Sequence, residues 1–355
     1  MSEFSIYRNK RVFITGHSGF KGSWMTLILK KLGAEIRGFS LKTNTSPNHF
    51  DLLDLSNSID HIEGDINNFG HLNKSINEFN PDFIFHLAAQ PLVKESYSNP
   101  IETLNTNVMG SVNVLESVRN CNSVRALVFI TSDKCYENVE WIWGYREVDR
   151  LGGHDPYSAS KAAAEIIFSS YQRSFFNNKD NFGAASARAG NVIGGGDWSA
   201  DRIIPDCIRS IEKNIPIVLR NPRSTRPWQH VLEPLSGYLL LGSKLYKNPK
   251  SFCGSWNFGP NTSDFKNVQY VANEIIKKMK KGTIEISTNT DNHHEANLLQ
   301  LNCDKATQLL NWAPRWSVDK TIEETAKWYS LYLEGKDIKK ISLDQLRDYF
   351  NGELE

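Results

Sequence analysis

The first half of the chain alternates short apolar runs with longer segments of helical periodicity. Apolar runs of strand length occur at residues 11–15, 35–40, 83–87, 125–131 and about 184–189. Between them lie stretches with apolar residues at helical spacing, at 20–32, 68–79, 99–120 and 156–174. Alternation of this kind predicts a parallel sheet with helices on both of its faces.

The pattern changes after residue 190. Three glycines at 194–196 are followed by more prolines and tryptophans and by shorter periodic segments. We expect a first domain over 1–190, to which part of 220–250 returns. A smaller lobe over 191–355 then lies against the carboxyl ends of the strands and holds the substrate. The spacing of Ser342 and Gln345 is that of a capping box and predicts the start of a last short helix.

Composition narrows the range of partners. The 355 residues carry a net charge of +1, which gives no strong field for nucleic acid or a membrane surface. No apolar run reaches membrane-spanning length, and residues 1–10 lack the apolar core of a signal peptide. The five cysteines are scattered and never spaced C-x-x-C. We therefore expect a cytoplasmic protein without disulfides or bound metal.

A glycine-rich turn follows the first apolar run. Arg11–Thr15 leads into the turn GHSGFKG, whose glycines are Gly16, Gly19 and Gly22. Glycines at these positions allow a tight turn, close approach of the backbone to a pyrophosphate, and packing of the next helix on the strand. The amino-terminal end of that helix adds partial positive charge. Lys21 is not followed by Ser or Thr, which excludes a P-loop. The turn predicts a dinucleotide site, with a tight turn that binds nothing as the alternative.

A second group of polar side chains is expected at the same edge of the sheet. Ser132, Asp133 and Lys134 follow the apolar run that ends at 131, and ligands bind at the carboxyl ends of such strands. Tyr157 and Lys161 lie one helical turn apart behind a proline that favours a helix start. A phenol, an ammonium, a hydroxyl and a carboxyl converging on one crevice are typical of an enzyme that moves protons and hydride. The alternatives are an exposed Tyr–Lys pair and an Asp133 that serves as a helix cap or ion-pairs with Lys134.

Taken together, the motifs resemble the extended short-chain dehydrogenase/reductase family over about residues 10–335, and within it the nucleotide-sugar 4,6-dehydratases. The glycine turn and Y-x-x-x-K are shared broadly across that family, whereas TSDKCYEN and GNVIGGGDW are much narrower. The other motifs that carry the resemblance are HLAAQPLV, WGYRE, DPYSASK and RPWQHVLEP.

The resemblance implies a Rossmann-type doubly wound parallel sheet with a smaller C-terminal α/β substrate-binding lobe. It also implies NAD held throughout the cycle and a nucleotide-sugar substrate, CDP-glucose, destined for deoxysugars of surface polysaccharide. Related proteins self-associate through helices of the first domain, so a homodimer or homotetramer is expected.

The implied reaction removes water across C5–C6 of the hexose, with oxidation of C4 and reduction of C6. The resemblance makes Tyr157 the base at the C4 hydroxyl, with Lys161 and the nearby nicotinamide cation lowering the Tyr157 pKa and Ser132 bonding the C4 oxygen. Asp133 is the protonated acid at the C6 hydroxyl. By the resemblance, dTDP-glucose 4,6-dehydratases carry a carboxylate where this chain has Lys134, whereas the dehydratases of CDP-glucose are similar to this chain in having lysine. We therefore take Lys134 as the C5 base, acting directly or through a water, which requires its neutral form.

The cofactor contacts implied by the resemblance extend beyond the glycines. Ser40 ends the second strand where a carboxylate usually meets the adenine ribose, and the resemblance implies that hydroxyl and backbone groups replace it. Lys42 is placed to meet a 2′-phosphate, so NADP is not excluded on local grounds. Asn107 is expected in the helix packing beneath the site. The full set of expected cofactor residues is Gly16, Gly19, Phe20, Lys21, Gly22, Ser40, Asp65, Ile66, Leu87, Ala88, Ala89, Asn107, Thr131, Tyr157 and Lys161.

For the sugar nucleotide, Asn191, Arg202 and Arg226 match family positions that hold the pyrophosphate and nucleoside. The guanidinium of Arg226 offers paired bonds to phosphate, whereas a surface role for Arg202 is an equal alternative. Gln90, Ser132 and His294 complete the expected substrate contacts. Two further interpretations stay open: a 4,6-dehydratase or 4-epimerase acting on another nucleotide sugar, and a catalytically silent NAD-binding protein.

Overall fold

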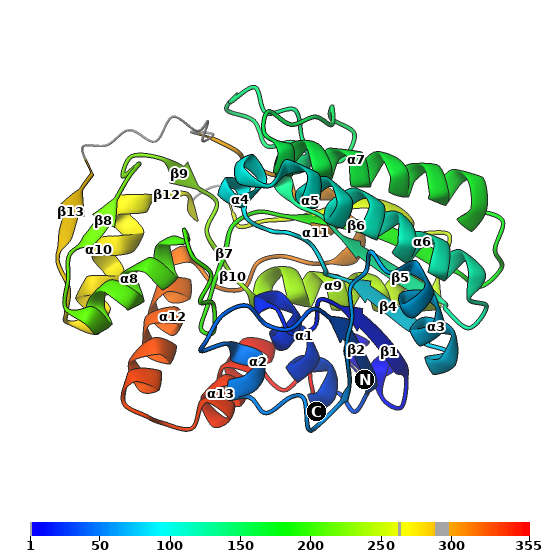
Figure 1. Cartoon of the computed structure of the whole chain (residues 1–355), viewed down its shortest axis with the longest axis horizontal. Coiled ribbons are helices and arrows are strands. Elements are labelled where there is room, and N and C mark those ends of the chain that lie inside the picture. The colour runs from blue at the N-terminus through cyan, green and yellow to red at the C-terminus, as the bar shows by residue number, and fades with distance from the viewer. Residues whose placement is uncertain (1, 262–263, 288–297) are drawn as a thin grey trace.

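A seven-stranded parallel sheet forms the centre of the molecule (Figure 1). The structure is a computed structural model that describes residues 2–261, 264–287 and 298–355. The strand order is β11-β6-β5-β4-β1-β2-β3, and each neighbouring pair is parallel. The strands are β1 (Arg11–Thr15), β2 (Glu35–Ser40), β3 (Asp60–Glu63), β4 (Phe83–His86), β5 (Ala126–Ile130), β6 (Gly183–Ala189) and β11 (Gly254–Phe258).

The inner strands are buried on both faces, as a parallel sheet requires. Every residue of β5 and β6 is buried, whereas the edge strand β3 is mostly exposed. One apolar cluster joins the sheet to α3 (Phe69–Phe79), α6 (Ser111–Asn120) and α7 (Pro156–Tyr171). The other joins the opposite face to α1 (Phe20–Lys31) and α9 (Leu232–Lys247). The predicted doubly wound α/β class is therefore confirmed.

Shorter helices connect these layers. The segment before α6 consists of α4 (Val93–Ser98), α5 (Pro100–Leu104) and a π-helical stretch, η2 (Asn105–Gly110). Three other pieces are irregular turns of helix: η1 (Glu3–Tyr7), η3 (Asp133–Cys135) and η4 (Gln172–Phe176). A four-residue helix, α2 (His49–Leu52), follows β2. Of these, η3 matters most because it begins directly after β5 and carries the predicted catalytic segment.

A smaller α/β region lies beside the carboxyl end of the sheet (Figure 1). Its helices α8 (Ile203–Lys213), α10 (Val268–Met279) and α12 (Val318–Leu333) pack in sequence, α8 on α10 and α10 on α12. Short strand pairs complete it: β8 (Ile217–Leu219) with β13 (Ile284–Ile286), β9 (Thr225–Arg226) with β12 (Lys266–Asn267), and β7 (Val192–Ile193) with β10 (Gln229–His230). The chain returns to the main sheet through α9 and β11. The domain boundary at residue 190 stays a prediction.

The last helices show one difference from the sequence-based expectation. After α11 (Asp304–Leu310), the final helix α13 runs over Ile338–Phe350 and is capped by Asp337, whose side chain accepts from the backbone N–H of Lys340. Ser342 lies inside this helix, fully buried, and its Oγ accepts from Trp328 Nε1 at 3.0 Å. The predicted capping box at Ser342 is therefore wrong, because Asp337, more than one turn earlier, caps the helix instead.

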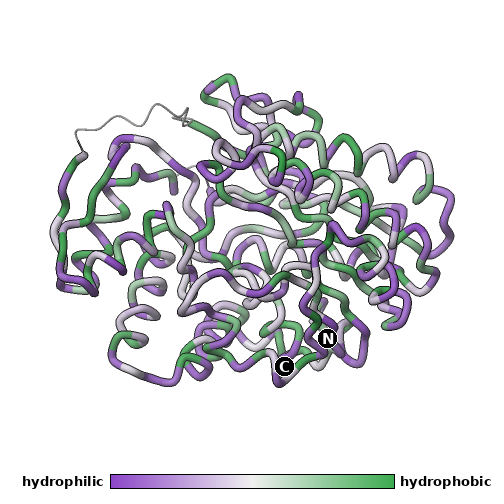
Figure 2. Tube along the Cα trace, viewed as in Figure 1, coloured by the Kyte–Doolittle hydropathy of each residue, from purple (hydrophilic) through white to green (hydrophobic). Residues whose placement is uncertain are grey.

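Hydropathy follows this architecture. Hydrophobic residues recur along the central strands, and hydrophilic ones are frequent on the outer turns (Figure 2). Among the described residues, no helix combines the length and the apolar character needed to cross a bilayer.

Candidate active site

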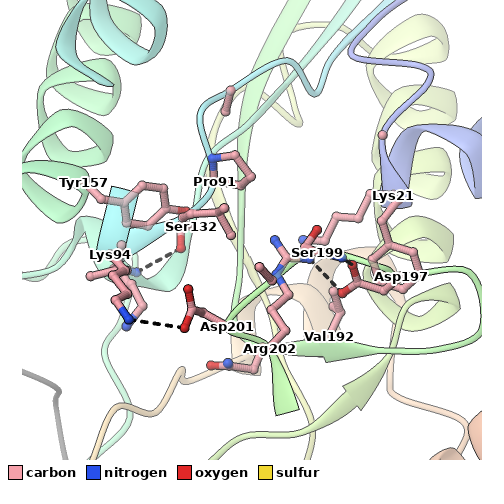
Figure 3. A pocket seen from close by; sticks show the side chains of 18 of the residues that line it. Lys21, Pro91, Lys94, Ser132, Tyr157, Val192, Asp197, Ser199, Asp201 and Arg202 are labelled. Atoms are coloured by element: carbon pink, nitrogen blue, oxygen red, sulfur yellow. Dashed lines mark hydrogen bonds and ion pairs between the residues drawn. The ribbon is translucent and has the colours of Figure 1, made fainter. Parts of the chain in front are cut away.

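A cavity of about 1010 Å³ opens at the carboxyl ends of the strands, between the sheet and the smaller α/β region. This is the crevice where open parallel sheets bind ligands. Its walls come from the glycine turn, from the segment after β5, from the start of α7, and from the loops around α8. Figure 3 shows Lys21, Ser132, Tyr157 and Arg202 gathered around this space.

The glycine turn is built to bring the backbone close to a ligand. Gly16 has φ +73°, and a Cβ there would lie 2.6 Å from the backbone nitrogen of Ala88. A Cβ on Gly22 would lie 2.0 Å from the carbonyl oxygen of Gly16. Gly19 caps the start of α1, and a Cβ there would approach the same carbonyl oxygen only to 3.4 Å. Gly16 and Gly22 are therefore fixed by packing, while Gly19 leaves room at a helix N-terminus, which fits a dinucleotide pyrophosphate.

The adenosine side of the cavity carries hydroxyls at the end of β2. Ser18 Oγ lies 2.7 Å from Ser40 Oγ, so the two hydroxyls form a pair where a carboxylate is more usual. Asp65 lies in the same wall and its Oδ1 accepts from the backbone N–H of Asn67 at 2.8 Å. The other expected cofactor residues in these walls are Phe20, Lys21, Ile66, Leu87, Ala88, Ala89 and Thr131.

The sequence predicted the start of α7 correctly. Pro156 occupies the first turn, and Asp155 caps it by accepting from the backbone N–H of Ser158 at 2.9 Å. Tyr157 and Lys161 follow on one face, 8% and 5% exposed, with Lys161 Nζ 5.9 Å from the centre of the Tyr157 ring. Both residues line the cavity. The alternative of an exposed Tyr–Lys pair is therefore excluded.

Ser132, Asp133 and Lys134 lie at the end of β5 and line the same cavity. Ser132 Oγ donates to Asp133 Oδ1 at 3.0 Å, and the backbone N–H of Lys134 donates to Ser132 Oγ at 3.3 Å. Asp133 Oδ2 is buried and has no hydrogen-bond partner among the described residues. Burial raises the pKa of Asp133, against the opposing charge of Lys134. A carboxyl in this setting holds a proton more readily than a solvated one.

The pKa of Tyr157 differs from the expectation. Burial raises it to about 12, although a hydrogen bond with Ser132 acts in the opposite direction. Burial also lowers the pKa of Lys161 to about 8. Loss of hydration is the largest influence on both groups, so in the chain on its own the net shift of the Tyr157 pKa is upward. The positive charge of Arg202 also acts to lower the Tyr157 pKa, but less strongly than burial raises it.

The substrate side of the cavity holds two of the predicted arginines. Arg202 Nη1 lies 2.9 Å from Asp197 Oδ2, and Arg226 Nη1 donates to the backbone oxygen of Thr225 at 3.0 Å. Asn191, which precedes both in the chain, lines the same cavity. The structure thus brings Asn191, Arg202 and Arg226 to the cavity that contains Tyr157.

Two predicted residues lie behind the cavity wall. The Gln90 side chain donates to Thr103 Oγ1 at 2.8 Å, and its backbone N–H donates to Asn107 Oδ1 at 2.8 Å. Asn107 is 1% exposed and also donates to Ser160 Oγ at 2.9 Å, so it joins η2 to α7 beneath the site. Neither residue lines the cavity, and their roles stay predictions. His294 lies outside the described residues.

The sequence did not point to three cavity residues that form ion pairs. Asp201 Oδ1 lies 3.5 Å from Lys94 Nζ and 3.1 Å from Arg220 Nη1, which joins α4 to the loops around α8 (Figure 3). Lys94 lies more than a hundred positions before Asp201 in the chain, and the three residues belong to no periodic pattern, so the sequence did not reveal the cluster. No group of His, Cys, Asp or Glu able to hold a metal occurs within the described part of the chain.

The sequence is similar to those of known nucleotide-sugar dehydratases. The sequence profile of the family described as GDP-mannose 4,6 dehydratase matches residues 13–325. The chain is 45% identical over 355 residues to a CDP-glucose 4,6-dehydratase of Salmonella typhimurium, covering 99% of each protein.

Solved structures share the fold at lower identity. An epimerase of Methanothermobacter thermautotrophicus matches with a TM-score of 0.81 and 24% identity, over 95% of this chain and 96% of that one. A dTDP-glucose 4,6-dehydratase of Bacillus anthracis, solved in complex with NAD, matches with a TM-score of 0.76 and 22% identity, over 94% of this chain and 99% of that one. At these identities the structures establish the fold alone.

Proposed function

The chain belongs to the GDP-mannose 4,6-dehydratase family, and we propose that it converts CDP-glucose into CDP-4-dehydro-6-deoxyglucose and water with bound NAD. The observation that carries the proposal is the convergence of Tyr157, Lys161, Ser132, Asp133 and Lys134 on one cavity beside the glycine turn. The full-length relative at 45% identity supports CDP-glucose over other nucleotide sugars.

NAD, when bound, supplies a hydride acceptor for C4 and later a hydride donor for C6, so the reaction consumes no cofactor. The chain supplies the proton transfers. Tyr157 takes the proton of the C4 hydroxyl, and Ser132 orients the C4 oxygen beside it. The buried Lys161 ammonium and the positive nicotinamide favour the phenolate that Tyr157 needs, against the burial that raises its pKa to about 12.

The loss of water requires a base that removes the C5 hydrogen and an acid that protonates the departing C6 hydroxyl. The C4 ketone acidifies the C5 hydrogen, which Lys134 removes directly or through a water. Asp133, whose pKa burial raises, gives a proton to the departing C6 hydroxyl. The two side chains follow one another at the end of β5. An elimination across neighbouring carbons thus has its acid and base on one short turn.

The main rival is a 4-epimerase on the same fold. An epimerase shares Tyr157 and Lys161 but has no need of an acid and a base for loss of water. The buried Asp133 Oδ2, which has no hydrogen-bond partner in the described part of the chain, lies beside Lys134 and favours the dehydratase. A silent NAD-binding protein is disfavoured because every group that the chemistry needs lines the cavity.

The test is a panel of nucleotide sugars. Purified protein with NAD is incubated separately with CDP-, dTDP-, GDP- and UDP-glucose, and products are followed by mass spectrometry for loss of one water. We expect loss of water from CDP-glucose at the highest kcat/KM. Loss of water only from another sugar would correct the substrate, and a change of configuration without loss of water would establish the epimerase.

Assembly and location form part of the proposal. Exposed apolar side chains occur on α5, η2 and α7, among them Ile101, Met109 and Ile166 at 74%, 52% and 57% exposure. These helices contact one another, and a face of this kind favours a homodimer or homotetramer. Sedimentation of the purified protein tests it. All five cysteines are unpaired, which supports a reducing, cytoplasmic location.

A further inference from the structure

A buried ion pair lies directly beneath the catalytic end of β5. Glu165 Oε2 lies 2.7 Å from Arg188 Nη2, with the two side chains 1% and 3% exposed. Glu165 stands on α7 one turn after Lys161, and Arg188 stands on β6, the strand paired with β5. Neither residue lines the cavity. Two desolvated charges need additional partners to be tolerated, and the identity of those partners indicates what the pair does.

Glu165 reaches the last residue before the catalytic segment. Its Oε1 accepts from Thr131 Oγ1, and its Oε2 accepts from Ser186 Oγ at 2.8 Å. Thr131 immediately precedes Ser132. One carboxylate therefore ties the start of the segment to the helix that carries Tyr157 and Lys161.

Arg188 reaches the other end of the segment. Its Nη1 donates to Tyr136 Oη at 2.7 Å, and its guanidinium carbon lies 4.9 Å from the centre of the Tyr136 ring. Tyr136 Oη in turn donates to Asn257 Oδ1 at 2.8 Å, on β11. Arg188 also donates to Ser255 Oγ at 2.9 Å, which fixes its own position.

The Glu165–Arg188 ion pair thus contacts the chain on both sides of residues 132–135. Thr131 lies before Ser132, and Tyr136 follows Lys134 and Cys135, so both ends of the turn that carries the acid and base bond to one ion pair. We propose that Glu165 and Arg188 are positioning residues that hold the Ser132–Lys134 turn against α7 in register with Tyr157. The proposal rests on the proposed function, since it assigns these residues to the same reaction.

The charge of Glu165 adds a second effect, on Lys161. The groups whose charge acts on Lys161 come from several elements: Glu165 on its own helix, Cys135 on η3, His86 on β4 and Lys21 on α1. Of these, Cys135 and Glu165 raise the Lys161 pKa, against the burial that lowers it to about 8. Burial also raises the pKa of the Cys135 thiol, which is therefore uncharged at neutral pH, so Glu165 is the one of the two that carries charge there. Removing the carboxylate lowers that pKa further, so activity that needs charged Lys161 should be lost at lower pH.

The test compares Glu165→Gln with a matched variant, Glu324→Gln. Glu324 is also a buried carboxylate on a helix, 2% exposed and paired with Lys320, but it lies on α12 outside the cavity wall. We expect Glu165→Gln to lower kcat by about 100-fold, the effect of a misplaced catalytic group. The KM should stay within about threefold, and the alkaline limb of the kcat profile should move to lower pH. Glu324→Gln should leave kcat and the pH profile unchanged.

A second variant guards against failure to fold. Tyr136→Phe removes only the hydroxyl that Arg188 holds and leaves no unpaired buried charge, and it should lower kcat by about 10-fold. Arg188→Lys should retain more kcat than Arg188→Met. Equal losses of stability in Glu165→Gln and Glu324→Gln, with wild-type kcat in both, would overturn the proposal.

An activity-independent readout separates this proposal from the assigned substrate. Hydrogen exchange of a peptide spanning residues 131–136 should speed up in Tyr136→Phe and Glu165→Gln, while exchange in α12 stays unchanged. If CDP-glucose is not the substrate, the kcat ratios are measured with whichever sugar the wild-type protein accepts. Unchanged exchange in 131–136 would contradict the positioning role whatever the substrate.

Discussion

Lys134 is the residue on which the elimination depends most. It follows Asp133 at the end of β5 and lines the cavity, at the position where the sequence resemblance led us to expect a carboxylate in the dTDP-glucose 4,6-dehydratases. A carboxyl group accepts a proton in its charged form, whereas an amine accepts one only in its neutral form. A lysine in place of a carboxylate therefore changes the protonation state in which the C5 hydrogen can be removed.

Replacing Lys134 with methionine tests this role. We expect Lys134→Met to lower turnover by at least about 100-fold, since the loss of a positioned base costs that much, and to stop exchange of the C5 hydrogen with deuterated solvent. Lys266→Met, which removes a lysine outside the cavity wall, is the control. Full turnover by Lys134→Met would show that another group is the base.

The pH dependence follows from Lys161. Burial lowers its pKa to about 8, so the ammonium is present below that pH and is lost as the pH rises through it. We expect kcat to fall above about pH 8 for this reason. In Lys161→Arg the charge persists, so the alkaline limb should move upward or vanish even if kcat is lower. A wild-type profile that stays flat to about pH 10, where an ordinary solvated lysine begins to lose its proton, would contradict the assignment.

Much of the site could be predicted from local sequence, and the rest could not. Gly16, Gly19 and Gly22 follow a strand at fixed spacing, and Tyr157 and Lys161 share a helix face, so periodicity alone places them. The Lys94–Asp201 ion pair joins residues more than a hundred positions apart. Nothing in either local sequence marks the other as its partner.

At the scale of elements, the glycine turn and the start of α1 act as one unit. A side chain on Gly22 would collide with the backbone of Gly16 and His17, at 2.0 Å and 2.7 Å. A side chain on Gly19 meets its first neighbour at 3.4 Å, an ordinary contact. The two glycines therefore differ in what their substitution should do, although both belong to one motif.

Comparison of two alanine variants tests this difference. Gly22→Ala should unfold the turn or lower the melting temperature strongly, because backbone atoms cannot yield. Gly19→Ala should fold with a near wild-type melting temperature and lose affinity only for NAD, since its methyl group faces the helix N-terminus. Circular dichroism melts and NAD titration measure both effects. A stable Gly22→Ala that binds NAD normally would refute this account of the turn.

Two strands, β3 and β11, were not predicted from the sequence, and the same physical reason explains both omissions. β3 reads DHIE and is an edge strand that is mostly exposed, so it lacks the apolar run that marked the inner strands. β11 reads GSWNF, and its last three residues, Trp256, Asn257 and Phe258, are buried where the strand pairs with β6 at the edge of the sheet. Their strand character depends on pairing with distant segments rather than on local composition.

At the scale of the whole molecule, the cavity depends on contacts that join the two sides. Trp24 Nε1 on α1 donates to the backbone oxygen of Gly195 at 2.9 Å, and the backbone N–H of Asp197 donates to Tyr329 Oη at 3.0 Å. The loop that carries Asp197 and Arg202 is thereby held between α1 and α12. A ligand that fills the cavity should therefore stabilise the entire fold.

Thermal denaturation with NAD tests this coupling. At free NAD about 100 times its Kd, unfolding should cost about 2.7 kcal/mol more, and the melting temperature should rise by several degrees. Nicotinamide mononucleotide should give a smaller shift, because it leaves the wall with Ser40, Asp65 and Ile66 unfilled. Equal shifts with both compounds, or none with NAD, would contradict the position of the cofactor.

The central claim is that one cavity oxidises C4 and reduces C6 of the same sugar. The most direct measurement uses CDP-glucose carrying deuterium at C4, with the product examined by mass spectrometry and NMR and with Tyr157→Phe as the inactive control. The account predicts a 4-keto-6-deoxy product that has lost one water, carries the deuterium at C6 and forms without net consumption of NAD. Deuterium retained at C4, or released to solvent with no dehydrated product, would contradict it.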